Sequence, residues 1–309
     1  MLERIFRETI GIKKEEEVLI VSDYNSFEMD EIIRKTVEKL NREVVSIIMK
    51  PRERDGEEPP GVIAESMRAA DVVIAPTSKS LTHTEARKRA CRAGTRVVTM
   101  PGITKSMLFS DAMTADYREI KRISDFIARK LTEADEIRIE TDAGTDFKAS
   151  LKYRKGISDS GDITKTGAFG NLPAGEAFIA PLEDSGVGRI VFDASMANLG
   201  RIAQPVIVEV SNGRAFNVNR PELEELFRSV ENSRVIAEIG IGCNPNARIT
   251  GNVLEDEKAF KTVHIAFGDN NTFGGMNRAN LHMDGVMLKP SLWLDGKKIM
   301  EEGNFLCFR

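Results

Sequence analysis

The chain has 309 residues, of which 41% are hydrophobic and 30% charged, a balance typical of a soluble globular protein. Its 44 basic and 48 acidic residues give a net charge of −4 with no long basic stripe, which argues against nucleic acid as a partner. No stretch approaches the roughly 18 apolar residues of a membrane span, and the charged segment Met1–Lys14 lacks the apolar core of a signal peptide, so we expect a cytoplasmic protein without a membrane partner.

The first part of the chain alternates short apolar runs with helical patterns. The expected strands are Glu17–Ser22, Val44–Met49, Ala70–Ala75 and Thr95–Thr99. The expected helices are Asp30–Leu40, Gly61–Ala70, Thr84–Ala93 and Asp111–Leu131. Strands that alternate with helices are typical of a parallel α/β sheet. We therefore predict a Rossmann-like N-terminal domain over residues 1–134.

The pattern changes near Ala134, where runs of period two begin. The expected strands here are Glu136–Glu140, Asp146–Leu151, Phe178–Ile179, Gly188–Ala194 and Pro205–Ser211. One clear helix, Pro221–Asn232, starts with proline followed by acidic residues. Residues 135–309 are therefore predicted to form a mostly antiparallel α+β domain, and the fold class of the whole chain is α/β with two domains.

Two of the three histidines lie in strand-like runs of the last quarter. His264 lies in TVHIAF, and His282 lies in LHMDGVM, two residues before Asp284. Residues i and i+2 of a strand point to the same face, so His282 and Asp284 are expected to project together. With His264 from a neighbouring strand, two imidazoles and one carboxylate would meet, a ligand set that suits zinc or non-haem Fe(II). A structural role for a lone His-x-Asp pattern is the alternative.

Two carboxylates in apolar surroundings strengthen the metal hypothesis. Glu176 lies in PAGEAF and Glu238 in VIAEIGI. A carboxylate inside an apolar strand is costly unless a cation or a metal compensates it. An edge strand that turns Glu238 to solvent is the alternative. The many glycines nearby, Gly240 among them, would permit a close approach of the backbone to such a site.

Four blocks in order, PAGEAFIAP, AEIGIGCNP, EDEKAFKTVHIAFG and LHMD, resemble those of the aminopeptidase T metallopeptidase family. The resemblance covers most of the C-terminal half. It implies a homodimer with an α/β N-terminal half. The metal ligands that it implies are Glu176, Glu238, His264, His282 and Asp284.

Two features depart from the peptidase pattern. Asn271 stands where the peptidases have a tyrosine near the metals, and the linker between His264 and His282 is short. A branch that resembles the dihydroxypyridine ring-cleaving dioxygenases shares the scaffold, but holds one Fe(II) through His, His and Asp. The segment Ser80–Pro101 resembles an N-domain segment of the wider group, in which His83 would reach the site as an acid or base. A structural role at a helix end is the alternative for His83.

We predict a metal-dependent hydrolase that resembles aminopeptidase T and releases N-terminal residues from small peptides. One or two divalent ions (Zn, Co or Mn) would activate a water molecule, and Glu176 or Glu238 would accept its proton. A single ion would leave negative charge in the site unless a carboxylate is protonated or paired with a cation such as Arg248 or Lys258.

The alternative function is a non-haem Fe(II) ring-cleaving dioxygenase that acts on a small molecule through His264, His282 and Asp284. The extra glutamates would then lie around the metal ligands or contact the substrate. A third reading, a binding module with a structural metal, fits the carboxylate-rich ligand set less well, because structural zinc sites are usually closed sets of Cys and His.

Overall fold

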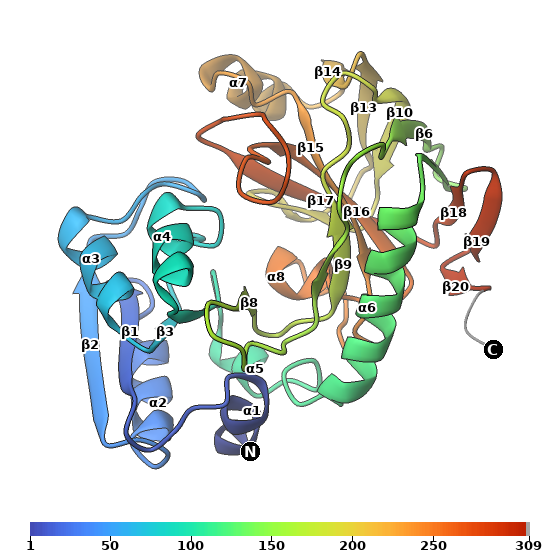
Figure 1. Ribbon diagram of the computed structural model, residues 1–309. Coiled ribbons are helices and arrows are strands. Elements are labelled where there is room, and N and C mark those ends of the chain that lie inside the picture. Colours follow the sequence, from blue (N-terminus) through green and yellow to red (C-terminus); the bar gives the residue numbers. More distant parts are fainter. Residues whose placement is uncertain (307–309) are drawn as a thin grey trace. The chain divides into compact units, whose positions relative to one another are not determined.

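The computed structural model describes residues 1–306 and divides them into two compact units (Figure 1). The first unit comprises Met1–Lys121 and Asp159–Ala174, and the second comprises Arg122–Ser158 and the chain from Gly175 onward. This division differs from the predicted domains 1–134 and 135–309, because the chain returns to the first unit after residue 158. The returning segment contains a strand of only three residues, Phe169–Asn171, which is too short to give a periodic signal.

The first unit is built on a parallel sheet, as predicted, which has five strands where the sequence indicated four. In their order across the sheet, the strands are β2 (Glu43–Met49), β1 (Glu17–Asp23), β3 (Val72–Ala75), β4 (Arg96–Thr99) and β8 (Phe169–Asn171). The helices are α1 (Leu2–Thr9), α2 (Phe27–Val37), α3 (Gly61–Ala69), α4 (Glu85–Ala93) and α5 (Lys105–Leu108). β3 and β4 are buried along their whole length. The apolar sequence of β3 and the two valines of β4 are typical of central strands in parallel sheets.

Helix α6 (Tyr117–Glu133) begins later than the predicted start at Asp111. Residues 111–116 form turns instead, and the side chain of Asp116 accepts a hydrogen bond from the backbone N–H of Arg118 at 3.0 Å. An aspartate that precedes a helix and accepts from the N–H of its second residue caps the helix N-terminus, so the helix begins at Tyr117.

The second unit contains two antiparallel sheets around one hydrophobic core. The eight-stranded sheet has the order β14 (Arg214–Val218), β13 (Val206–Ser211), β10 (Val187–Phe192), β6 (Asp146–Ser150), β5 (Glu136–Glu140), β18 (Ser291–Leu294), β19 (Lys297–Glu301) and β20 (Asn304–Phe305). The seven-stranded sheet has the order β12 (Gly200–Arg201), β11 (Ser195–Met196), β17 (His282–Leu288), β16 (Thr262–Gly268), β15 (Ile236–Gly242), β9 (Glu176–Ile179) and β7 (Ile157–Asp159). Helices α7 (Pro221–Ser229) and α8 (Val253–Asp256), together with α6 from Arg122 onward, complete the unit.

The centre of the seven-stranded sheet is fully enclosed. Every residue of β15 and β16 is buried, and the rings of Phe192 and Phe267 pack edge to face with centroids 6.0 Å apart. Polar side chains on these strands are therefore withdrawn from water and need partners within the protein.

In the described part of the chain, no helix combines the length and apolar character that a membrane crossing requires.

Candidate metal centre

Four neighbouring strands of the seven-stranded sheet carry the predicted ligands. Their order is β17, β16, β15 and β9. The residues are His282 and Asp284 on β17, His264 on β16, Glu238 on β15 and Glu176 at the start of β9. All five therefore come from one contiguous patch of sheet, although the chain separates the first from the last by more than a third of its length.

The expected pairing of His282 with Asp284 is present. The Nε2 atom of His282 lies 3.4 Å from Oδ1 of Asp284, so the two side chains project from the same face of β17. On the neighbouring strand, Nε2 of His264 lies 3.2 Å from Oε1 of Glu238, whose other oxygen lies 3.6 Å from Nε2 of His282. Glu238 thus lies between the two imidazoles. It is buried, with only 4% of its surface exposed, which excludes the alternative in which it faces solvent.

Glu176, on β9, completes the cluster. Its Oε2 atom lies 3.2 Å from Nε2 of His264, and it is as deeply buried as Glu238. Among the described residues, this Oε2 atom is a buried oxygen without a hydrogen bond. Buried polar atoms of this kind are rare in proteins and often mark the position of an ion or a water molecule.

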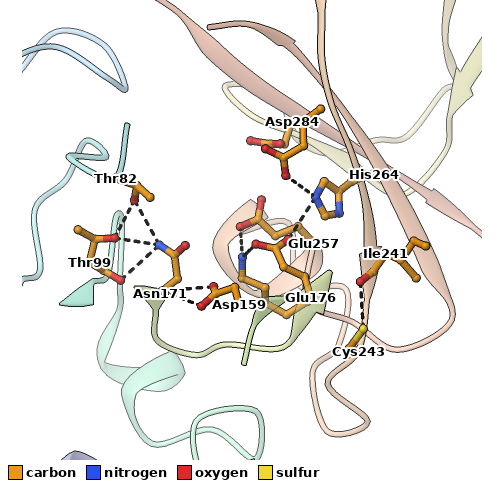
Figure 2. A network of polar contacts seen from close by, with 12 residues as sticks. Thr82, Thr99, Asp159, Asn171, Glu176, Ile241, Cys243, Glu257, His264 and Asp284 are labelled. Atoms are coloured by element: carbon orange, nitrogen blue, oxygen red, sulfur yellow. Dashed lines mark hydrogen bonds and ion pairs between the residues drawn. The ribbon is translucent and has the colours of Figure 1, made fainter. Parts of the chain in front are cut away.

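Two groups of potential ligand atoms occur in this unit, and His264 belongs to both. One group consists of Glu238, His264 and Asp284, and the other of Glu176, Glu257 and His264. Within each group, the atoms lie within 4.8 Å of one another. Figure 2 shows His264 with Asp284 on one side and with Glu176 and Glu257 on the other. Imidazole nitrogens and carboxylate oxygens are suitable ligands for zinc, manganese or non-haem iron, so the residues present fit a divalent ion.

Lys258 brings a positive charge into the cluster. Its ammonium group donates to Oε1 of Glu176 at 2.5 Å and to Oε1 of Glu257 at 2.6 Å, and its side chain is completely buried. Lys258, one of the two cations considered from the sequence, therefore pairs with a site carboxylate; the backbone N–H of Arg248 donates to Glu255. Sequence analysis misses Glu257, because the run Glu-Asp-Glu-Lys has the appearance of an exposed charged turn. The only signal for Glu257 is its place in the same block as His264.

The electrostatics of the cluster follow from burial and crowding. Burial, and then the neighbouring Asp284 and Glu176, raise the pKa of Glu238 despite its contacts with the histidines. Burial alone would raise the pKa of Glu176, but Lys258 and His264 outweigh it and lower that pKa. Burial lowers the pKa of His282, whereas Asp284 and Glu238 raise it more strongly, to about 10. In the absence of a metal, protons on the histidines thus offset part of the negative charge that a bound cation would neutralise.

Contacts outside the cluster orient His282. Its Nδ1 atom lies 2.8 Å from the backbone oxygen of Asp269, which leaves Nε2 directed at the cluster. The ring of Phe273 meets the imidazole edge to face, with centroids 5.8 Å apart, and Phe178 packs against Phe273 in the same manner. A backbone acceptor on the distal nitrogen of a histidine is the usual arrangement around metal ligands.

Two further residues singled out in the sequence are His83 and Asn271. His83 belongs to the first unit and precedes Thr84, whose side chain caps α4 by accepting from the backbone N–H of Arg87. The predicted role of His83 as an acid or base stays a prediction. Asn271, at the position of the peptidase tyrosine, lies half-buried in the loop between β16 and β17.

Comparisons with known proteins give one matching family and several similar structures, among them two that cover nearly the whole chain. The family model described as 2,5-dihydroxypyridine 5,6-dioxygenase matches residues 3–307. A 2,5-dihydroxypyridine 5,6-dioxygenase of Pseudomonas putida is 24% identical over 263 residues, which are 78% of this chain and 73% of that protein.

Both similar structures cover nearly the whole chain. The 2,5-dihydroxypyridine dioxygenase of Pseudomonas putida has a TM-score of 0.83 at 18% identity, over 100% of this chain and 97% of that one. AmpT of Thermus thermophilus has a TM-score of 0.69 at 15% identity, over 99% of this chain and 98% of that one. At these identities, the two structures establish a shared fold.

Proposed function

The chain belongs to the 2,5-dihydroxypyridine 5,6-dioxygenase family, and from this premise we propose that it is a non-haem Fe(II) dioxygenase that opens a dihydroxylated aromatic or nitrogen-containing ring. His264, His282 and Asp284 would hold the iron. This was the alternative in the sequence analysis, and the family match and the more similar structure both favour it over the peptidase hypothesis.

The observation that carries the proposal is the grouping of two imidazoles and one carboxylate on β16 and β17. Asp284 lies opposite Ala266, two residues after His264 on the neighbouring strand, and contacts His282 directly. Two histidines and one carboxylate are the ligand set of many Fe(II) oxygenases, in which the remaining coordination positions are left for substrate and oxygen. Bound Fe(II) would supply the redox chemistry that allows dioxygen to react with an aromatic ring.

The protein's own residues would position the ligands and exclude water. Glu238 contacts both imidazoles, and Phe273 shields one side of His282. The proposed reaction breaks one carbon–carbon bond of the ring and places both oxygen atoms of one dioxygen molecule in the product. It therefore consumes one dioxygen per ring and needs no external reductant.

Aminopeptidase activity is the second candidate, since AmpT shares the fold and all five predicted ligands lie together. Asn271 argues against it, because a carboxamide cannot supply the phenol that the resembling peptidases place near their metals.

One preparation can test both functions. Protein reconstituted with Fe(II) under anaerobic conditions is mixed with 2,5-dihydroxypyridine in an oxygen electrode, and the loss of ring absorbance is followed in parallel. Equimolar oxygen uptake and ring loss are expected, and His282→Ala should abolish both, whereas Met276→Ala, an exposed site on the neighbouring loop, should not.

The same protein loaded with Co(II), Mn(II) or Zn(II) is then incubated with an unblocked peptide and with its N-acetylated form. No cleavage is expected. Release of the N-terminal residue from the unblocked peptide alone, without oxygen uptake in the first assay, would replace the dioxygenase proposal with the peptidase.

A further inference from the structure

We propose that the ammonium group of Lys258 takes the place of a second metal ion, so that a ligand set able to hold two divalent ions holds one. The inference deepens the proposed function, because it explains how a scaffold shared with a peptidase would provide a centre with a single metal. It further implies that removing the charge of Lys258 creates a second metal site at the carboxylates of Glu176 and Glu257, next to the ion that His264 would hold.

The two groups of ligand atoms set the geometry. Glu238, His264 and Asp284 form one, and His282 contacts both carboxylates of that group. The other group shares His264 with the first and is equally compact, with its atoms within 4.8 Å of one another. It is not a surface cluster of acids: Glu176 and His264 are buried, and Oε2 of Glu176 is without a hydrogen bond.

Lys258 lies where an ion in the second group would bind. Its Nζ atom contacts one oxygen of Glu176 and one of Glu257, the two carboxylates of that group, at 2.5 and 2.6 Å. A cation held between these oxygens leaves no room for a metal ion between the same two atoms. The ammonium group also repels a second positive charge at such short range.

The backbone holds Lys258 in this position. Its carbonyl oxygen accepts from the backbone N–H of Asn244 at 2.8 Å, just beyond β15, and its own N–H donates to the carbonyl of Glu255 at 3.1 Å. Residues 244 and 259 form a parallel bridge beside it. These backbone hydrogen bonds fix the lysine between α8 and the end of β15. The fold therefore determines the position of its ammonium group.

The test counts Mn(II) ions per chain in protein that has been freed of metal and then titrated with Mn(II) alone. Bound metal is measured by elemental analysis after gel filtration and by electron paramagnetic resonance, which reports magnetic coupling when two Mn(II) ions share a ligand. We expect one ion in wild type, two coupled ions in Lys258→Met, one in Lys258→Arg, and one in Lys258→Met/Glu257→Gln.

Two ions in wild type, or a single ion in a folded Lys258→Met protein, would overturn the proposal. Lys258→Met leaves two buried carboxylates close together, so its folding is followed by circular dichroism as Mn(II) is added. We expect Mn(II) to restore the fold wherever the variant is unfolded without it. Failure to fold at every Mn(II) concentration, while the double variant folds, would also refute the proposal. The measurement of Mn(II) ions per chain uses neither substrate nor oxygen. Its result is therefore independent of the outcome of the dioxygenase assay.

Discussion

The imidazole of His264 lies directly against the backbone of Gly240, its partner across β15 and β16. A Cβ atom at Gly240 would come within 2.0 Å of Nε2 of His264, the nitrogen that faces Glu176 and Glu238. His264 can therefore occupy its position only because Gly240 has no side chain.

We predict that Gly240→Ala displaces the imidazole and weakens Mn(II) binding by roughly 10-fold or more, the scale of substitutions around metal ligands. Overpacking should also lower the free energy of unfolding by about 1–3 kcal/mol. Isothermal titration calorimetry and chemical denaturation measure the two effects. Gly61→Ala is the control, because a Cβ there meets open space; equal Mn(II) affinity in both variants would contradict the prediction.

His282→Ala should remove a direct metal ligand. We expect its metal content after dialysis to fall to a small fraction of that of wild type, with circular dichroism unchanged, since the ring lies at the end of β17 rather than in the main core. Met276→Ala, on the exposed loop, should retain its metal. Equal metal content in wild type and His282→Ala would show that the histidine is structural.

Glu238→Gln should change the melting temperature of the metal-free protein and that of the Mn(II)-loaded protein in different ways. Without metal, the substitution removes a buried negative charge that lies close to Asp284 and Glu176, so the melting temperature should stay the same or rise. With Mn(II), the gain in melting temperature should shrink, because the affinity falls by about 10-fold. Glu231→Gln, at an exposed position, should behave as wild type in both states. A large loss of stability without metal would count against this reading.

Glu183 anchors the loop between β16 and β17. One of its oxygens accepts from Asn270 and from the backbone N–H of Met276, and the other pairs with Arg154 at 2.5 Å. Burial raises the pKa of Glu183, but these donors outweigh it and hold the pKa below 4.5. A lowered carboxyl pKa contributes stability above the unfolded pKa, and this contribution is lost as the pH falls through the folded value.

At pH 7 we therefore expect Glu183→Gln to lower the free energy of unfolding by about 1 kcal/mol, as for one lost hydrogen bond. As the pH falls below 4.5, the difference from wild type should shrink toward zero. Urea denaturation of both proteins between pH 7 and pH 3 measures this. A difference that stays constant with pH would mean that the carboxylate charge is not involved.

Local pattern was sufficient to predict part of this structure. The apolar runs predicted the parallel strands β1 to β4. β1, β3 and β4 are buried, as such runs suggest, whereas β2 is an edge strand that is largely exposed or half-buried. The spacing of His282 and Asp284 predicted a shared face, and the apolar flanks of Glu238 predicted a buried carboxylate. In each case the information lies within a few consecutive residues.

What could not be predicted depends on pairing between distant segments. The three residues of β8 become a strand only because β4 offers them an edge. The Glu-Asp-Glu-Lys run has the composition of a surface turn, yet Lys258 is buried and Glu257 half-buried, and Lys258 pairs with Glu176 from the distant strand β9. No periodic pattern within either segment indicates that the two segments contact each other in the fold.

The pairing of Val97 with Phe169 also affects the folding of the nascent chain and the choice of fragments that can fold alone. During synthesis, the edge of β4 stays unpaired until β8 has been made. β8 follows α6 and the first strands of the other unit in the sequence. A fragment that ends at Ala134 would keep that edge open permanently, and open edges invite intermolecular pairing and aggregation. An independently folding N-terminal fragment therefore has to carry residues 159–174, joined through a short linker in place of residues 122–158.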